Sequence, residues 1–344
     1  MKKKIVIGCA CILLATVVLL GFLQALLVPK YVTRSKEGSL TAEYYLEENP
    51  DHDVLFVGDC EVYECFTPPT LWEEYGITSY VRGTPQQLAW QSYYLLEDSL
   101  RYESPKVVVF NVLALKYGKP QNEAYNRMTI DGMRWSTAKV DAILASMTEE
   151  ESFASYVFPL LRFHSRWNEL GEEDFFYLFS RPSVSHNGYL MQTGVKPPLD
   201  SEIEPDPLAD YTLPQTSMDY LDQMRALCEE KGITFILIKA PTNNWKYHWY
   251  DEWDGQIKDY ADTHGLDYYN FIPLGDQIGI DWQSDTYDGG AHLNVYGAEK
   301  LTSYFGAILA DTYGLENRSA DAELSALWQT KTDRYYAERN ASEQ

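Results

Sequence analysis

A cysteine at a predicted strand-to-helix junction is the first residue of this sequence that could carry out nucleophilic chemistry. Cys60 follows an apolar run, residues 54–57, and the dipeptide Gly58-Asp59. An unbroken apolar run is typical of a parallel strand buried on both faces, and a short polar residue after it is typical of a helix N-cap. Such a junction lies at the carboxyl edge of the sheet, where ligands bind, and its N–H groups and helix dipole favour a thiolate. A purely packing role, or a Cys60–Cys65 disulfide, is the alternative that the sequence leaves open.

A histidine and an aspartate near the end of the chain could serve that thiol. Asp288 precedes His292 by four residues, with Gly289 and Gly290 between them. A short glycine turn lets the carboxylate reach the imidazole and fix its tautomer, and the imidazole can then take a proton from a nucleophile. Asp285 is the fallback for the orienting carboxylate. A histidine in such a loop is often structural, and the nearby carboxylate is what favours catalysis.

The elements that must position these residues follow a strand–helix rhythm. Strands are expected at 54–57, 77–81, 107–110 and 233–238, with a short last one at 266–269, and helical patterns separate them. This alternation predicts an α/β fold with one parallel sheet. The same rule places three further residues at the edge that carries Cys60, because they follow the second, third and fourth strands: Gly83, Asn111 and Lys239.

Residues 114–215 interrupt this rhythm. Helical pieces are expected at 137–147, 151–161 and 172–179, and a long loop rich in Pro, Ser and Asp covers 181–215. We interpret 114–215 as an insertion that covers the sheet edge and acts as a candidate substrate lid. A final amphipathic helix is expected near 320–338, within a C-terminal segment of residues 320–344.

The N-terminus predicts a membrane anchor. Residues 5–28 carry no charge, and these 24 residues would span about 36 Å as a helix, enough to cross a bilayer. The run is longer than a signal-peptide core, so an uncleaved anchor is expected. Lys2, Lys3 and Lys4 precede it and favour a cytoplasmic N-terminus. Residues 1–36 would then be the cytoplasmic tip and anchor, and 37–344 a domain outside the membrane.

The charge of that domain argues against nucleic-acid binding. Residues 1–36 hold six of the 28 basic residues and none of the 51 acidic ones, so the remainder has 22 against 51, a net charge of −29. Such a charge repels nucleic acid and anionic headgroups.

Five cysteines are too few for a disulfide scaffold.

Two motifs resemble the SGNH/GDSL hydrolase superfamily. Gly58-Asp-Cys-Glu resembles its Gly-Asp-Ser elbow, and the block from Asp288 to His292 resembles its closing Asp-x-x-His block. The resemblance covers about residues 50–313 without the insertion. It implies a flavodoxin-like three-layer α/β/α sandwich, with Gly83 and Asn111 as oxyanion-hole residues. Two departures stand out: cysteine replaces the nucleophilic serine, and the Asp-to-His spacing is one residue longer.

The combination of anchor and external domain looks most like the branch that includes alginate acetylation proteins and the D-alanine transfer protein of teichoic acid synthesis. That resemblance implies a single-pass cell-membrane protein that transfers or hydrolyses acyl esters on a cell-surface polysaccharide or polymer. Cys60 would be the nucleophile and His292 the base, oriented by Asp288. A multi-spanning membrane acyltransferase is the implied partner. The alternative is a non-catalytic partner of that enzyme which binds the polymer.

Other candidates are weaker. Arg127 and Lys239 could contact a polar substrate, although surface or strand-end roles explain them as well. The sequence shows no metal-ligand spacing, phosphate-binding glycine loop or dinucleotide fingerprint, so no metal or cofactor is expected.

Overall fold

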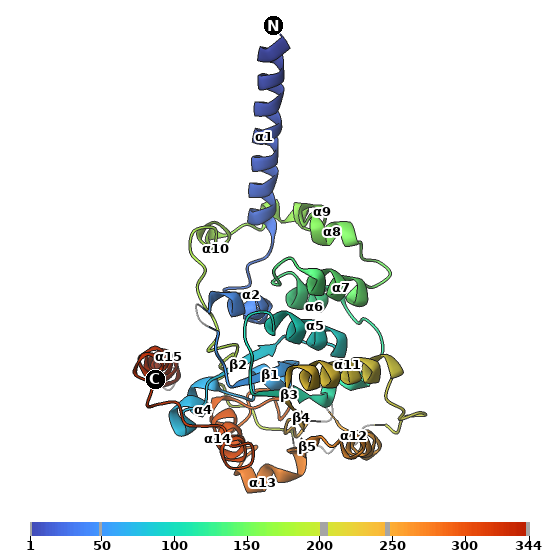
Figure 1. Cartoon of the computed structure of the whole chain (residues 1–344), viewed down its shortest axis with the longest axis vertical. Coiled ribbons are helices and arrows are strands. Elements are labelled where there is room, and N and C mark those ends of the chain that lie inside the picture. Colours follow the sequence, from blue (N-terminus) through green and yellow to red (C-terminus); the bar gives the residue numbers. More distant parts are fainter. Residues whose placement is uncertain (1, 48–49, 200–205, 245–247, 342–344) are drawn as a thin grey trace.

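A five-stranded parallel sheet forms the centre of the molecule, as predicted. The computed structural model describes residues 2–47, 50–199, 206–244 and 248–341. A long helix, α1, projects from the α/β domain that contains the sheet (Figure 1). The sheet order is β2-β1-β3-β4-β5, and all neighbouring pairs are parallel. The strands are β1 (Val54–Gly58), β2 (Ser79–Gly83), β3 (Val107–Asn111), β4 (Thr234–Lys239) and β5 (Asp267–Asn270).

Helices cover both faces of the sheet. Alternate strand residues point to opposite faces, so Phe56 packs in one core and Leu55 and Val57 in the other. The first core includes residues of α4 (Pro68–Tyr75) and α14 (Val295–Asp311). The second includes residues of α5 (Ala89–Ser99), α11 (Gln215–Lys231) and α12 (Asp251–His264). This is the layering of an α/β/α sandwich.

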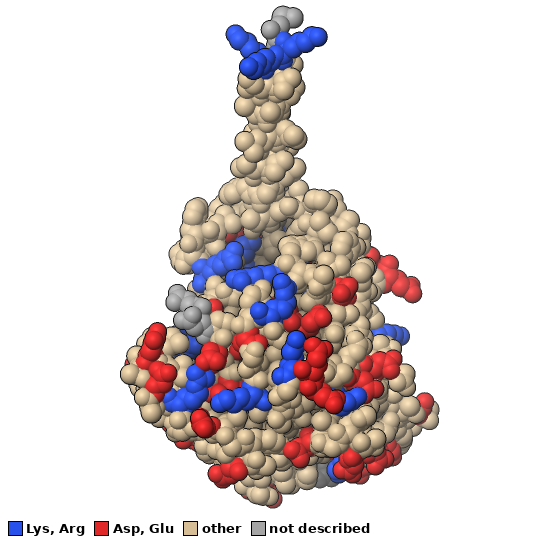
Figure 2. Space-filling model, viewed as in Figure 1, with Lys and Arg blue, Asp and Glu red and all other residues tan. Residues whose placement is uncertain are grey.

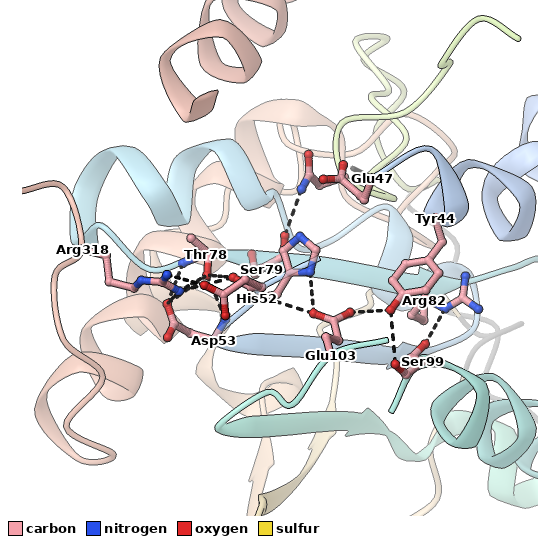
Figure 3. Close-up of polar contacts among 12 residues, drawn as sticks. Tyr44, Glu47, His52, Asp53, Thr78, Ser79, Arg82, Ser99, Glu103 and Arg318 are labelled. Carbon is pink, nitrogen blue, oxygen red and sulfur yellow. Dashed lines mark hydrogen bonds and ion pairs between the residues drawn. The ribbon is translucent and has the colours of Figure 1, made fainter. Parts of the chain in front are cut away.

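The second strand begins and ends two residues later than expected. We expected it to end before the charged Arg82, but Arg82 lies within β2 and is buried. Its Nε donates to Ser99 Oγ at 3.0 Å, and its guanidinium lies 4.1 Å from the Tyr44 ring centroid (Figure 3). Tertiary partners on α5 and on the lead-in to the sheet therefore allow an arginine to continue a buried strand.

The segment between α1 and the sheet is part of the fold. It contains η1 (Lys36–Ser39), α2 (Leu40–Glu43) and η2 (Tyr44–Leu46). The Tyr44 hydroxyl donates to Glu103 Oε1 at 2.6 Å, and His52 Nδ1 lies 2.7 Å from Glu103 Oε2 (Figure 3). Both contacts are buried, and they fasten this lead-in segment to the loop before β3.

The insertion forms several short helices. The first piece expected, 137–147, corresponds to α7, whereas the second is divided at Pro159, because proline cannot continue a helix. C-terminal helix α15 lies beside α4 (Figure 1). The remaining elements are α1 (Lys2–Leu27), α3 (Cys60–Tyr63), η3 (Val112–Lys116), α6 (Glu123–Ile130), α7 (Thr137–Ser146), α8 (Phe153–Val157), α9 (Leu160–Phe163), η4 (His164–Asn168), α10 (Glu172–Phe176), η6 (Ile272–Leu274), α13 (Gly275–Ile278) and α15 (Ala322–Ala341).

Candidate active site

Cys60 begins a helix directly after β1, at the carboxyl edge of the sheet. Asp59 is the N-cap of α3, and its Oδ1 accepts a hydrogen bond from the Glu61 N–H at 3.2 Å. A Cβ at Gly58 would lie 2.5 Å from Val62 Cγ2, so only glycine allows the chain to turn this tightly into the helix. The strand order makes β1 and β3 neighbours, with β2 and β4 outside them, and this reversal point is where such sheets bind ligands.

Asp288 holds the His292 imidazole. Asp288 Oδ2 lies 2.7 Å from His292 Nδ1, and Asp288 Oδ1 accepts the His292 backbone N–H at 2.9 Å. Gly289 and Gly290 both have φ of +87°, the left-handed conformation that brings the carboxylate back to the ring. The fallback carboxylate, Asp285, instead pairs with Lys300 at 2.6 Å.

The fold brings Cys60 and His292 together from the two ends of the domain. A hydrogen bond joins the Cys60 thiol to the His292 imidazole. Both side chains are buried, with 7% and 5% of the residue exposed. Cys60 and Cys65 are both thiols, so no disulfide joins these two described residues.

The protonation of this pair differs from the thiolate that the helix N-terminus suggested. Burial raises the pKa of Cys60, and this outweighs the lowering effect of the nearby His292. Burial alone would lower the pKa of His292, but Cys60, Glu64 and the hydrogen bond to Asp288 raise it well above its usual value. Although burial opposes its ionisation, Asp288 has a lowered pKa because His292 donates to it. Because the charge of the Cys60 sulfur contributes most to raising the pKa of His292, the two groups are coupled and exchange one proton: a thiol lies beside an imidazole, or a thiolate beside an imidazolium.

Glu64 is a second carboxylate at the histidine, and the sequence analysis missed it. Its Oε2 lies 3.4 Å from His292 Nδ1, and its Oε1 accepts a hydrogen bond from the Tyr287 hydroxyl at 2.9 Å. Burial raises the pKa of Glu64 to about 7. The Tyr287 ring stacks on the imidazole with centroids 6.2 Å apart. The spacing of four residues from Cys60, one helical turn, was the signal that could have revealed Glu64.

The two predicted oxyanion residues lie at this edge, but with different surroundings. Gly83 pairs with Gly58, and a Cβ there would lie 3.1 Å from Tyr63 Cβ. The Asn111 amide donates to Asp59 Oδ1 at 3.1 Å and to Glu61 Oε2 at 3.0 Å. Both amide hydrogens of Asn111 are therefore used within the protein. Its oxyanion role stays a prediction.

Neither weak substrate-binding candidate points its charge into an open site. The Lys239 ammonium is fully buried and donates to both Glu61 oxygens and to Ala240 O, each at 2.8 Å, which uses all three of its hydrogens. Arg127 lies on α6 within the insertion. Its guanidinium bonds to Glu123 at 2.9 Å and to Ser155 at 2.7 Å. Both cations therefore stabilise the fold in this structure.

The end of the insertion covers the loop that carries Asp288 and His292. The Leu190 N–H donates to Tyr63 O at 2.8 Å, which places this segment against α3. The Lys196 N–H donates to Thr286 O at 2.8 Å, and the Gly289 N–H donates to Lys196 O at 2.8 Å. Residues 190–196 thus pack on both parts of the site.

Within the described residues, no group of three or more His, Cys, Asp or Glu side chains could hold a metal ion. No known protein-family model matches this sequence, and no curated protein does either.

Proposed function

We propose that this protein is a membrane-anchored, SGNH-like acyl-ester transferase or esterase that acts on a cell-envelope glycan or polymer. The observation that supports this most is the hydrogen-bonded series from the Cys60 thiol through His292 to Asp288. It has the order nucleophile, base and orienting acid, and it begins at the strand edge where α/β sheets bind ligands.

The chemistry follows from these three residues. Asp288 occupies Nδ1 of His292, so the other ring nitrogen exchanges the proton with Cys60. As the sulfur attacks the ester carbonyl, the thiol proton moves to His292, a carbon–sulfur bond forms, and Asp288 stabilises the imidazolium. His292 then returns the proton to the departing alcohol as the ester carbon–oxygen bond breaks, leaving an acyl thioester on Cys60.

The second half of the reaction decides between transfer and hydrolysis. His292 takes a proton from an acceptor hydroxyl or from water, the new oxygen attacks the thioester, and the proton returns to the Cys60 sulfur. Because burial raises the pKa of Cys60, the thiol ionises only as it attacks, and His292 is required as general base. The backbone N–H groups of Cys60 and Gly83 would donate hydrogen bonds to the oxyanion. The Asn111 amide would do the same after giving up its hydrogen bond to Asp59 or to Glu61.

The location of this chemistry rests on α1. This helix is long and apolar enough to cross a membrane. Three lysines precede the apolar run, which supports a cytoplasmic N-terminus and a single-pass cell-membrane protein with its main domain outside. The resemblance adds the polymer substrate and a multi-spanning membrane acyltransferase as partner.

One observation favours the alternative, a non-catalytic subunit that binds the polymer beside such an acyltransferase. The Asn111 amide and the Lys239 ammonium are both occupied by buried carboxylates, and the Cys60 thiol is buried and un-ionised. With these polar groups occupied by the protein and the thiol un-ionised, the site resembles a binding site that does not catalyse a reaction.

Turnover of p-nitrophenyl acetate by the full-length protein in detergent separates the two functions. The transferase predicts that Cys60→Ala abolishes turnover, that Cys60→Ser retains a measurable part of it, and that Cys228→Ala leaves it unchanged because Cys228 lies in the core away from the site. Thermal unfolding of each variant checks the fold. Equal rates for wild type and Cys60→Ala would exclude the cysteine mechanism and leave the binding function.

A further inference from the structure

The helices around the outer end of α1 expose an unusual number of large apolar side chains. We call residues 153–179, which contain α8, α9, η4 and α10, the collar. Leu161, Trp167 and Phe179 are 59%, 72% and 91% exposed. Soluble surfaces seldom gather so much apolar area without a partner. The other large apolar side chains that the collar exposes are Phe158, Phe175 and Phe176.

The collar is attached to the end of α1. Helix α1 contacts α9, η4 and α10, with α10 on one side of its base and α8 and α9 on the other (Figure 1). Arg166 Nη1 donates to Leu27 O at 2.6 Å, and Lys30 Nζ donates to Ala25 O at 2.5 Å. These cations satisfy the last carbonyl groups of α1, which otherwise lack partners. The collar therefore has a fixed height relative to the helix.

That height corresponds to the boundary of a bilayer. A hydrocarbon core about 30 Å thick is crossed by about 20 helical residues. Counted from Ile5, the first residue after the three lysines, such a span ends near Gln24. Leu26 and Leu27 are already buried by the protein. The collar thus begins where α1 leaves the hydrocarbon.

The side chains beneath the apolar ones suit the headgroup region. Lys30 and Arg181 lie 5.9 and 5.7 Å from the centroid of the Tyr177 ring, with Arg166 and Asp174 nearby. Figure 2 shows Lys and Arg side chains gathered just below the apolar shoulder of the molecule. Tyrosine, tryptophan and basic residues are the usual neighbours of lipid headgroups. Such a mixture is uncommon on a domain whose net charge is strongly negative.

We infer that the collar is a membrane-docking surface whose apolar side chains enter the outer boundary of the lipid bilayer around α1. It would hold the active-site domain at a fixed distance and orientation above the membrane. This inference rests on the proposed anchoring by α1 and not on the acyl chemistry. Interfacial segments of this type are buried about 5–10 Å into the boundary between headgroups and acyl chains.

The test places an environment-sensitive NBD fluorophore on the full-length protein in phosphatidylcholine/phosphatidylglycerol vesicles. Leu161→Cys carries it in α9 and Phe179→Cys three residues after the end of α10, and Leu327→Cys on α15 is the exposed control. Cys9→Ala and Cys11→Ala remove the exposed native thiols, and this parent without a new cysteine gives the background.

Docking predicts blue-shifted emission at both collar positions. It also predicts quenching by shallow spin-labelled lipid that is roughly two-fold or more stronger than at position 327. Equal quenching of all three positions by aqueous iodide would overturn the inference. Protection of the collar fluorophores from iodide in native membranes but not in pure lipid vesicles would also overturn the inference, because it would indicate that a protein partner covers the collar. Extraction of the same vesicles with alkaline carbonate shows whether α1 is inserted in the bilayer. A negative fluorescence result for protein that resists extraction therefore counts against docking of the collar and not against the anchor.

Discussion

At the scale of single residues, the site is unusual because two carboxylates face one imidazole nitrogen. Asp288 makes the short contact with His292 Nδ1, and Glu64 lies 3.4 Å from the same atom. Both negative charges favour a proton on the ring. Glu64 has a raised pKa of about 7 because it is buried, so its charge changes near neutral pH. The basicity of His292 is therefore coupled to the charge of Glu64.

Glu64→Gln tests this coupling. A nearby negative charge raises the pKa of His292, so its removal lowers that pKa, and the acidic limb of the kcat/KM profile is expected to move to lower pH. The hydrogen bond from Tyr287 can be kept by the glutamine. A profile identical to that of wild type would show that Glu64 does not influence the base.

The same variant has an effect on stability that needs no activity. Since the pKa of Glu64 rises from 4.5 to about 7 on folding, its ionisation costs stability as pH increases through this window. Wild type is expected to lose about 2–3 kcal/mol more than Glu64→Gln between pH 4 and pH 8, as measured by denaturant unfolding. An equal loss in both proteins would mean that Glu64 is not desolvated.

Asp288→Asn compared with Asp285→Asn identifies the orienting carboxylate. Because Asp288 fixes the ring tautomer, its loss should reduce kcat by about 10²–10⁴, with KM little changed. Asp285 pairs with Lys300, so its variant should keep kcat within a few-fold while losing some stability. The reverse order of effects would reassign the role.

At the scale of elements, a buried polar network fixes the ends of three strands around the site. Asn111 at the end of β3 bonds to Asp59 and Glu61 after β1, and Lys239 at the end of β4 pairs with Glu61. The Asn111 Oδ1 also accepts the Ala240 N–H at 3.1 Å. The polar side chains of this network therefore bind one another, and their contacts within the protein explain their presence without a substrate.

Lys239→Met should be strongly destabilising, because it leaves the Glu61 carboxylate buried without its cation. The expected loss is about 3–5 kcal/mol, and Lys239→Met with Glu61→Gln should recover a large part of it. Lys258→Met removes an ion pair whose lysine side chain is 61% exposed, and it should cost under about 1 kcal/mol. Denaturant unfolding measures all three, and equal losses for the two lysine variants would contradict the network.

Much of this fold could be predicted from the sequence, since the strands are short apolar runs and Gly58 and Gly76 mark their neighbouring turns. The convergence of Cys60 on His292 followed from chain order and from the parallel sheet. What the pattern could not provide was the choice of partners in three dimensions. Arg82 continues a buried strand because its guanidinium packs on the Tyr44 ring and donates a hydrogen bond to Ser99. Asn111 donates to buried carboxylates whose positions cannot be read from the hydrophobic periodicity of the sequence.

At the scale of the whole molecule, the lead-in segment and the insertion connect the sheet to α1. Tyr44 and His52 bond to Glu103 beside the sheet, while Glu43 accepts hydrogen bonds from Ser183 and Ser185 at the end of the insertion. The same insertion surrounds the base of α1 and continues to the active-site loop. The end of the molecule that carries α1 and the sheet edge that carries Cys60 and His292 are therefore joined by continuous packing.

The anchor gives a prediction at this scale. In intact cells, added protease should remove a tag fused after Gln344 and leave a tag fused before Met1, because Lys2–Lys4 favour retention of the N-terminus inside. Permeabilised cells are the control, in which both tags are removed. A mature N-terminus beyond residue 28 would contradict the uncleaved anchor.

The most direct test of the central claim is to look for the acyl thioester on Cys60. The protein is incubated with p-nitrophenyl acetate, quenched in acid, digested and analysed by mass spectrometry, with Cys65 and Cys228 as internal controls since both are buried thiols. We predict one hydroxylamine-labile acetyl group on Cys60, absent in His292→Ala and replaced by a hydroxylamine-resistant ester in Cys60→Ser. Acetylation of the three thiols to the same extent, or equal labelling of Cys60 in wild type and His292→Ala, would contradict a nucleophile activated by His292.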